Sequence, residues 1–303
     1  MRAFGGCTLV GLIVASCLSG GAAWAEPCLR DGDRVVLLGD TFIEREGEQG
    51  FIETALVATH PTASLTFRNL GWSGDTVWAD SRGVFDPPAK GYARMLALVK
   101  ELSPTVIFLA YGRNESFRGP AGLAAFRDQL STLCEDLRAA TGAGASATRL
   151  VFVTPHPFEG VDAAHRNAAL ADYCVAIRMI AADQKATLVD LFAKLAAELP
   201  AESSATENGV HLSATGYAAA ARVFAAACGG ELPADFAIRS AVVRQLVIDK
   251  NRLFFHRWRP ANETYIFLFR KHEQGNNAVE IPQFDPLVEA AEAKVRAAAR
   301  ALP

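Results

Sequence analysis

Four short polar motifs in this sequence, three after apolar runs and one before the last predicted helix of the domain, supply a hydroxyl, two hydrogen-bond donors and an imidazole. Thr41 stands in GDT, Gly74 in NLGWSGDT, Asn114 in YGRNES and His211 in NGVHLS. A histidine that accepts the hydroxyl proton makes threonine a nucleophile for an acyl carbon. A glycine N–H and an asparagine amide can both donate to the oxyanion that then forms. Asn208, three residues before His211, could hold the other ring nitrogen. The motifs therefore predict acyl-transfer chemistry.

The elements that must position these motifs alternate between apolar runs and amphipathic stretches. Short, continuously apolar runs are typical of parallel strands buried on both faces. The predicted strands occupy 34–39, 64–71, 105–112, 148–155 and 186–192, and predicted helices occupy 51–60, 91–102, 122–141, 167–184 and 212–228. This alternation predicts an α/β fold with a parallel sheet covered on both faces. Ligands of such sheets bind beyond the carboxyl ends of the strands, where three of the motifs lie.

Taken together, the four motifs resemble those of the SGNH (GDSL) hydrolase superfamily over residues 34–230. The resemblance implies a flavodoxin-like three-layer α/β/α sandwich, and the activity of an esterase, lipase, thioesterase or carbohydrate deacetylase. It implies that Thr41 occupies the nucleophile position and that His211 and Asn208 complete the catalytic group. Gly74 and Asn114 match the residues of the oxyanion hole. The expected function is an exported ester hydrolase, an acyl or acetyl esterase with carbohydrate O-acetyl groups as one candidate substrate.

Two residues depart from the family pattern. Thr41 replaces the serine nucleophile, and its methyl group crowds attack and stiffens χ1. Asn208 replaces the aspartate that orients the histidine. An asparagine can accept a hydrogen bond, but it lacks the charge that stabilises an imidazolium and can present its NH2 to the ring. In serine proteases the equivalent change lowers the rate by about 10⁴. The alternative function is a weak or inactive SGNH-fold protein that binds a glycan or acyl ligand.

Other polar and aromatic residues near these motifs are less favoured candidates for substrate contact. Arg113 and Glu115 flank Asn114, Trp72 lies near the glycine motif, and His156 follows the fourth predicted strand. Glu44 and Arg45 follow Thr41 on its predicted helix and could reach the cleft, although a surface pair is the favoured expectation. No CxxC or Cys/His spacing suggests a metal site, and the proposed chemistry needs no cofactor.

The first 25 residues are predicted to be a secretory signal peptide rather than part of the fold. A positive start precedes an apolar run, and Ala23 and Ala25 form an A-x-A cleavage site before Glu26. The protein is therefore expected to be exported, to the periplasm or outside the cell. VASC, residues 14–17, resembles a lipoprotein box, so lipid anchoring through Cys17 is the alternative. No later run is apolar for long enough to span a membrane.

The mature chain is predicted to contain a hydrolase domain, 26–230, and a C-terminal extension, 231–303. The extension lacks the strand–helix alternation; it is rich in aromatic and basic residues and ends in a predicted helix at 287–302. Its aromatic residues could pack it against the domain, or its basic residues could bind an anionic group, and we favour packing. A net charge of −3 gives no sign of nucleic-acid binding. The expected partner is a small-molecule or polysaccharide ester.

Four cysteines remain after cleavage at Ala25, and they allow three pairings. Export would expose them to oxidising conditions. Cys28 precedes the first predicted strand and Cys228 ends the last helix of the domain, two positions that often lie close together. We therefore favour a Cys28–Cys228 disulfide. Cys134 and Cys174 fall inside predicted helices and are expected to be buried, unpaired side chains.

Overall fold

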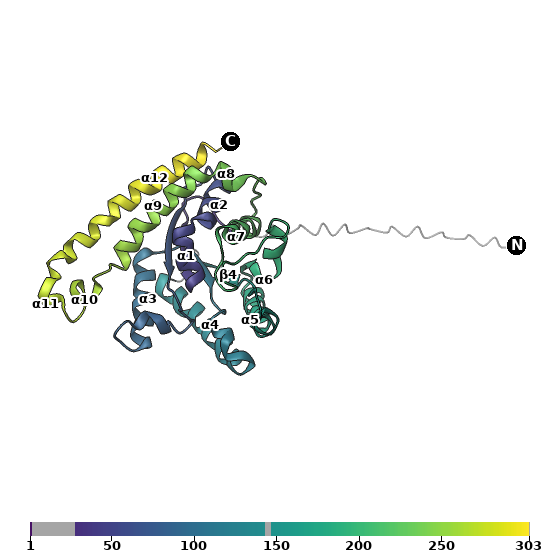
Figure 1. Ribbon diagram of the computed structural model, residues 1–303, viewed down its shortest axis with the longest axis horizontal. Helices are drawn as coiled ribbons and strands as arrows, with labels where there is room; N and C mark the ends of the chain where they lie inside the picture. Colours follow the sequence, from purple (N-terminus) through teal and green to yellow (C-terminus); the bar gives the residue numbers. More distant parts are fainter. Residues whose placement is uncertain (2–27, 143–146, 303) are drawn as a thin grey trace.

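The sheet of this protein consists of short parallel strands, of which the three central ones are almost wholly buried. The computed structural model describes Met1, residues 28–142 and residues 147–302 (Figure 1). The strands are β1 (Arg34–Gly39), β2 (Thr66–Gly71), β3 (Val106–Ala110), β4 (Arg149–Thr154) and β5 (Thr187–Asp190), in the order β2-β1-β3-β4-β5. This is the flavodoxin-like order. The predicted fold class is confirmed.

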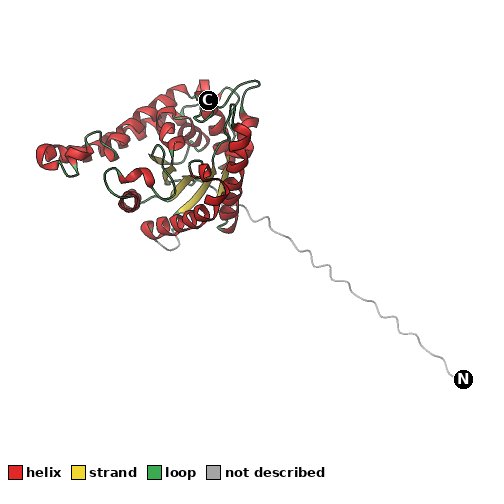
Figure 2. Cartoon of the chain, turned by 60° about the horizontal axis from the view of Figure 1, so that its bottom comes forward, coloured by secondary structure: helices red, strands yellow, loops and turns green. Residues whose placement is uncertain are grey.

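Helices cover both faces of the sheet and make three layers (Figure 2). Alternate β1 side chains enter two apolar cores, one that includes Val35 and Leu37 and one that includes Val36 and Leu38. The first core is closed mainly by α1 (Thr41–Gln49), α2 (Phe51–Thr59) and α7 (Ala214–Ala227), and the second by α3 (Pro88–Leu102), α4 (Gly119–Thr141) and α5 (Ala163–Asp183). Shorter elements are η1 (Asp80–Gly83), η2 (Glu115–Arg118), α6 (Leu191–Lys194) and η3 (Leu195–Glu198).

The C-terminal extension contains two long helices, of which the sequence analysis predicted only one. The predicted helix is α12 (Phe284–Arg300), and the unpredicted one is α9 (Ala241–Trp258). They lie side by side along one flank of the molecule (Figure 1). The remaining elements of the extension are α8 (Phe236–Arg239), α10 (Glu263–Ile266), α11 (Lys271–Gln274) and η4 (Gly275–Gln283).

The extension covers β2, which is an edge strand of the sheet. The backbone N–H of Phe67 donates to Glu292 of α12 (3.0 Å), and Lys250 of α9 donates to the Phe67 carbonyl (3.0 Å). Lys250 is fully buried and pairs with Glu53 of α2 at 2.8 Å. Buried charges on the extension thus occupy edge groups that would otherwise need another partner. The extension packs on the sheet, as the sequence favoured, although the predicted boundary at residue 230 remains a prediction.

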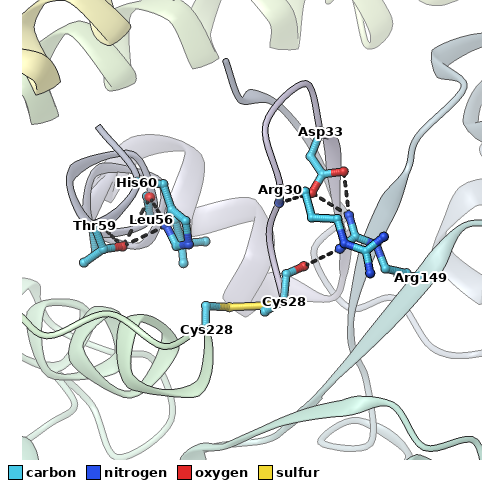
Figure 3. The surroundings of a disulfide bond; sticks show 9 residues. Cys28, Arg30, Asp33, Leu56, Thr59, His60, Arg149 and Cys228 are labelled. Carbon is cyan, nitrogen blue, oxygen red and sulfur yellow. Dashed lines mark hydrogen bonds and ion pairs between the residues drawn. A yellow bond between two sulfur atoms is a disulfide. The ribbon is translucent and has the colours of Figure 1, made fainter. Parts of the chain in front are cut away.

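The favoured disulfide is present, between the segment before β1 and the end of α7 (Figure 3). Cys28 and Cys228 are joined across a sequence separation of 200 residues. Cys134 and Cys174 are unpaired and buried, also as predicted. The signal peptide, its cleavage site and Cys17 lie outside the described residues. Within the part of the chain that is described, no helix has the length and apolar character needed to cross a membrane.

Candidate active site

Thr41 is held at the point where β1 turns into α1. The Asp40 carboxylate caps the helix by accepting the Phe42 N–H (2.9 Å), so Thr41 becomes the first helical residue. Its side chain is half-buried, and its hydroxyl accepts the backbone N–H of Gly74 at 3.0 Å. The hydroxyl therefore lies at the carboxyl edge of the sheet and at the positive end of a helix.

The loop after β2 reaches Thr41 because two glycines allow it. A Cβ on Gly71 would lie only 2.0 Å from the backbone nitrogen of Glu44, so only glycine lets β2 end this close to α1. Gly74 has a φ of +73°, in the left-handed region that disfavours other residues. This turn directs the Gly74 N–H toward the Thr41 hydroxyl.

Asn114 follows β3 and contacts the same loop. Its Nδ2 donates to the Asp75 carbonyl at 2.7 Å, which fixes the amide plane. The Asp75 side chain is buried below, where Arg82 (2.6 Å) and Tyr111 (3.1 Å) donate to it. An asparagine amide has two N–H groups, so the second remains available for a ligand. The loop after β2 and the residue after β3 therefore present donors on the same side of the sheet.

The amide of Asn208 presents its NH2 to the His211 ring. Its Oδ1 accepts the backbone N–H of Val210 (3.1 Å) and of His211 (2.8 Å), whereas its Nδ2 lies 3.0 Å from His211 Nδ1. Because the two backbone donors hold Oδ1, Nδ2 must donate to Nδ1. The proton of a neutral ring then resides on Nε2. An aspartate in this place would instead accept Nδ1–H and leave Nε2 free to accept a proton.

The electrostatic surroundings keep the His211 ring neutral. Burial and the positive charges of Arg45 and Arg113 hold its pKa below the ordinary value, while Glu207 acts in the opposite direction. Arg113 also lowers the pKa of the buried Asp40 carboxyl, which desolvation nevertheless raises to about 6. Arg113 thus acts on His211 and on Asp40, the residue before Thr41. In the described residues, 28–142 and 147–302, the Thr41 hydroxyl and the His211 ring are not joined by a hydrogen bond.

Arg113 and His156 lie together beneath the candidate site. They are 6% and 2% exposed, and Arg113 Nη2 lies 2.7 Å from His156 Nδ1 while also donating to the His156 carbonyl. The guanidinium stacks 4.3 Å from the Phe158 ring centroid. Burial, and then the positive charge of Arg113, hold the pKa of His156 well below its ordinary value. These side chains support the loops after β3 and β4, and their predicted contact with substrate remains a prediction.

Glu115 is also buried, with 1% of its surface exposed. Its carboxylate accepts the backbone N–H groups of Val77 and Gly112, both at 2.8 Å. Burial raises its pKa to about 7 against these two bonds, which lower it. Both oxygens therefore fasten the loop after β2 to the loop after β3, a role that positions Asn114. Contact of Glu115 with substrate remains a prediction.

The ring of Trp72 packs against other side chains of the protein. The Arg259 guanidinium lies 3.7 Å from its centroid and that of Arg82 lies 5.6 Å away. Trp258 packs edge-on at 5.7 Å. The ring thus takes part in internal packing, and its use as a platform for sugar stacking remains a prediction.

Glu44 and Arg45 were expected to form a surface pair, but each of them binds a different partner. Glu44 accepts hydrogen bonds from Ser73 and Arg259, and Arg45 pairs with Glu207 at 2.7 Å. Their spacing supports the alternative that both could reach the cleft, because residues three and four positions after Thr41 lie on its face of the helix. Among the described residues, no three His, Cys, Asp or Glu side chains gather as metal ligands would.

The fold is similar to that of known esterases. The acetylxylan esterase Axe2 from Geobacillus stearothermophilus superimposes with a TM-score of 0.54 and 19% identity over 67% of this chain and 97% of that one. A variant of it, described as an acetyl-xylooligosaccharide esterase, has a TM-score of 0.54 and 20% identity over the same shares. Catalytic mutants of Axe2 replace a serine, an aspartate and a histidine, the aspartate three positions before the histidine.

A comparison with curated proteins finds no match. The model of one family, the GDSL-like Lipase/Acylhydrolase family, matches residues 37–219, which contain all four motifs of the site. Because the match spans more than half of the chain and agrees with its fold, the chain belongs to this family of ester hydrolases.

Proposed function

We propose that this protein is an exported carbohydrate O-acetylesterase in which Thr41 is the nucleophile. The observation that carries the proposal is the 3.0 Å hydrogen bond from the Gly74 N–H to the Thr41 hydroxyl, with the Asn114 amide fixed against the same loop. A hydroxyl in this place meets an acyl carbon whose oxygen faces both donors. The likeness to an acetylxylan esterase supports an acetylated carbohydrate as the substrate.

In the proposed reaction the Thr41 oxygen attacks the acetyl carbon and its proton passes to His211 Nε2. The Thr41 and Gly74 N–H groups and the Asn114 amide donate to the resulting oxyanion, each contributing roughly 3 kcal/mol. The C–O bond to the sugar then breaks, and the sugar oxygen takes the proton from His211. A water molecule, deprotonated by the same ring, then attacks the acetyl carbon. The bond to Thr41 breaks, acetate leaves, and the ring returns the proton to the Thr41 oxygen.

Asn208 makes this reaction slow. The ring proton on Nε2 blocks proton transfer, so His211 must first lose its bond to Asn208 and adopt the other tautomer. No carboxylate then balances the imidazolium that forms. The low rate expected of this protein is therefore attributed to His211, while the oxyanion donors still contribute to kcat.

The second candidate is a protein that binds a glycan or acyl group without turnover. The specific observation that favours it is the Asn208 NH2 group at 3.0 Å from His211 Nδ1, since a ring protonated on Nε2 is a hydrogen-bond donor to a ligand. Thr41, Gly74 and Asn114 would serve equally well as ligand contacts. The two candidates differ only in whether a covalent acyl intermediate forms.

Hydrolysis of p-nitrophenyl acetate and acetylated xylooligosaccharides by residues 26–303 separates the two candidates. We expect slow hydrolysis that Thr41→Ala and His211→Ala abolish and that Thr41→Ser increases. Full activity of Thr41→Ala would exclude Thr41 as the nucleophile. If no ester in a broad panel is cleaved while acetylated oligosaccharides still bind, the binding function is correct. Export is tested by fractionating cells that express the full chain, with Cys17→Ser as the control for lipid anchoring.

A further inference from the structure

Glu44 connects the C-terminal extension to the loop that carries Gly74. It lies three residues after Thr41 on α1, and its carboxylate accepts the Ser73 hydroxyl (2.7 Å) and the Ser73 N–H (2.9 Å). The same carboxylate accepts Nη1 of Arg259 at 2.6 Å. Although partial burial opposes it, these bonds lower the pKa of Glu44. The carboxylate is therefore ionised and held on both sides.

Arg259 also contacts the loop directly. It follows the last residue of α9, and its guanidinium stacks 3.7 Å from the centroid of the Trp72 ring. The ring centroid of Phe255, one turn earlier on α9, lies 5.6 Å from the same guanidinium. Arg259 thus stacks on Trp72 and is linked to Ser73 through Glu44. Trp72 and Ser73 are the two residues immediately before Gly74.

The loop needs such support because it is exposed and turns sharply. Ser73 and Gly74 are exposed, and Gly74 adopts a positive φ. An oxyanion donor contributes fully only when its direction is fixed before the reaction begins. A displacement of about 1 Å at such a group can lower a rate by about 10²-fold.

We propose that Arg259 is a positioning residue of the active site, which holds Trp72 and Ser73 so that the Gly74 N–H stays directed at the reacting oxygen. This inference rests on the proposed esterase function. It assigns a role in the reaction to the extension, because Arg259 lies outside residues 37–219, which match the family. The extension then completes the site as well as covering the edge of the sheet.

Arg257 provides a matched control two residues away. It also ties α9 to neighbouring elements, through Glu101 (3.0 Å) and Asp285 (2.8 Å), and its side chain is 21% exposed against 27% for Arg259. In the described part of the chain, no ion pair or hydrogen bond joins Glu101 or Asp285 to Thr41 or Gly74. Loss of Arg257 weakens the docking of the extension without touching the loop.

The test compares Arg259→Ala, Arg259→Lys and Arg257→Ala by amide hydrogen exchange and by acetyl ester hydrolysis. Arg259→Ala should accelerate exchange in peptides that cover Trp72–Ala79 and lower kcat by about 10- to 100-fold, with KM changed less than about twofold. Arg259→Lys keeps the charge near Glu44 but not the planar stack, so its exchange rate and its kcat should lie between those of the wild type and Arg259→Ala. Arg257→Ala should change neither.

Unchanged exchange in Arg259→Ala, or equal effects in Arg257→Ala, would overturn the proposal. Faster exchange with an unchanged kcat would also overturn it, since the loop would then move without consequence for the reaction. If the wild-type protein cleaves no ester, the proposed function fails, and the exchange data alone decide whether Arg259 holds the loop. Should Arg259→Ala not fold, Arg259→Lys carries the same comparison.

Discussion

Replacement of Asn208 by aspartate should convert a slow hydrolase into a faster one. In the protein Oδ1 is held by two backbone N–H groups, so the atom that faces His211 Nδ1 is the amide nitrogen. Asn208→Asp puts an oxygen in that place. The oxygen accepts Nδ1–H, and Nε2 is then free to take the proton of Thr41.

Two contributions set the size of the increase. The wild-type ring must give up one neutral hydrogen bond to reach the productive tautomer, which costs about 1 kcal/mol. A bond between the new carboxylate and the imidazolium adds about 1.5–3 kcal/mol. Their sum, about 2.5–4 kcal/mol, corresponds to an increase in kcat of about 10²- to 10³-fold. The exposure of Asn208 explains why this is below the roughly 10⁴-fold seen for the reverse change in a serine protease.

The assay is the pH dependence of kcat for p-nitrophenyl acetate. His211 must be neutral to act as a base, and its pKa in the wild type is lowered by burial and by Arg45 and Arg113. A carboxylate at 208 raises that pKa, so the acidic limb of the Asn208→Asp profile should move to higher pH while the plateau rises. The same substitution in a His211→Ala background should give no increase. An unchanged plateau, with His211→Ala still inactive, would refute the tautomer argument.

Three further predictions concern stability. Burial raises the pKa of Glu46 from 4.5 to about 8, so the folded protein keeps a proton that the unfolded chain loses, and the free energy of unfolding should fall as pH rises through this range. Glu46→Gln should remove roughly 3–5 kcal/mol of this fall, as measured by urea unfolding at pH 5 and pH 8.5. If the free energy of unfolding changes equally with pH in the wild type and in the variant, the prediction is contradicted. Lys250→Met should cost about 3–5 kcal/mol because it leaves Glu53 buried without its partner, whereas adding Glu53→Gln should recover most of the loss. Additive losses in chemical unfolding would exclude this coupling. Cys28→Ala/Cys228→Ala should lower the free energy of unfolding by about 5 kcal/mol, since the disulfide closes a loop of about 200 residues. A loss below about 1 kcal/mol would show that it contributes little.

The sheet and most helices of the domain were predictable because their signals are local. The run Val35–Leu38 is apolar at every position, as expected of a strand buried on both faces, and the strand forms as predicted. The helix α9 was missed for the opposite reason. Lys250 and Asn251 are charged or polar residues on its buried face, and they interrupt the apolar pattern. Their burial makes sense only beside Glu53 and β2, which lie far away in the sequence.

The sequence indicated which candidate residues lie together, Gly74 with Thr41 and Asn208 with His211, but not the hydrogen bonds that they make. The spacing of Asn208 and His211 indicates that they meet, yet the direction of the amide depends on where the backbone N–H groups of 210 and 211 point. Glu44 and Arg259 are 215 residues apart, so their bond has no local signal at all. Sequence patterns give the elements that carry a site more readily than the contacts that orient it.

The two departures from the family pattern share one physical property, which explains how the site can be intact in shape and altered in chemistry. Thr41 still accepts the Gly74 N–H, and Asn208 still accepts the backbone N–H groups of its own turn. Each residue keeps the hydrogen bonds that build the local structure. The changes concern the reacting groups: Thr41 places a methyl group beside the attacking oxygen, and Asn208 presents a donor to the His211 ring where an aspartate would present an acceptor. We therefore expect a serine and an aspartate in these two places to change the path of the proton and to leave these backbone hydrogen bonds in place.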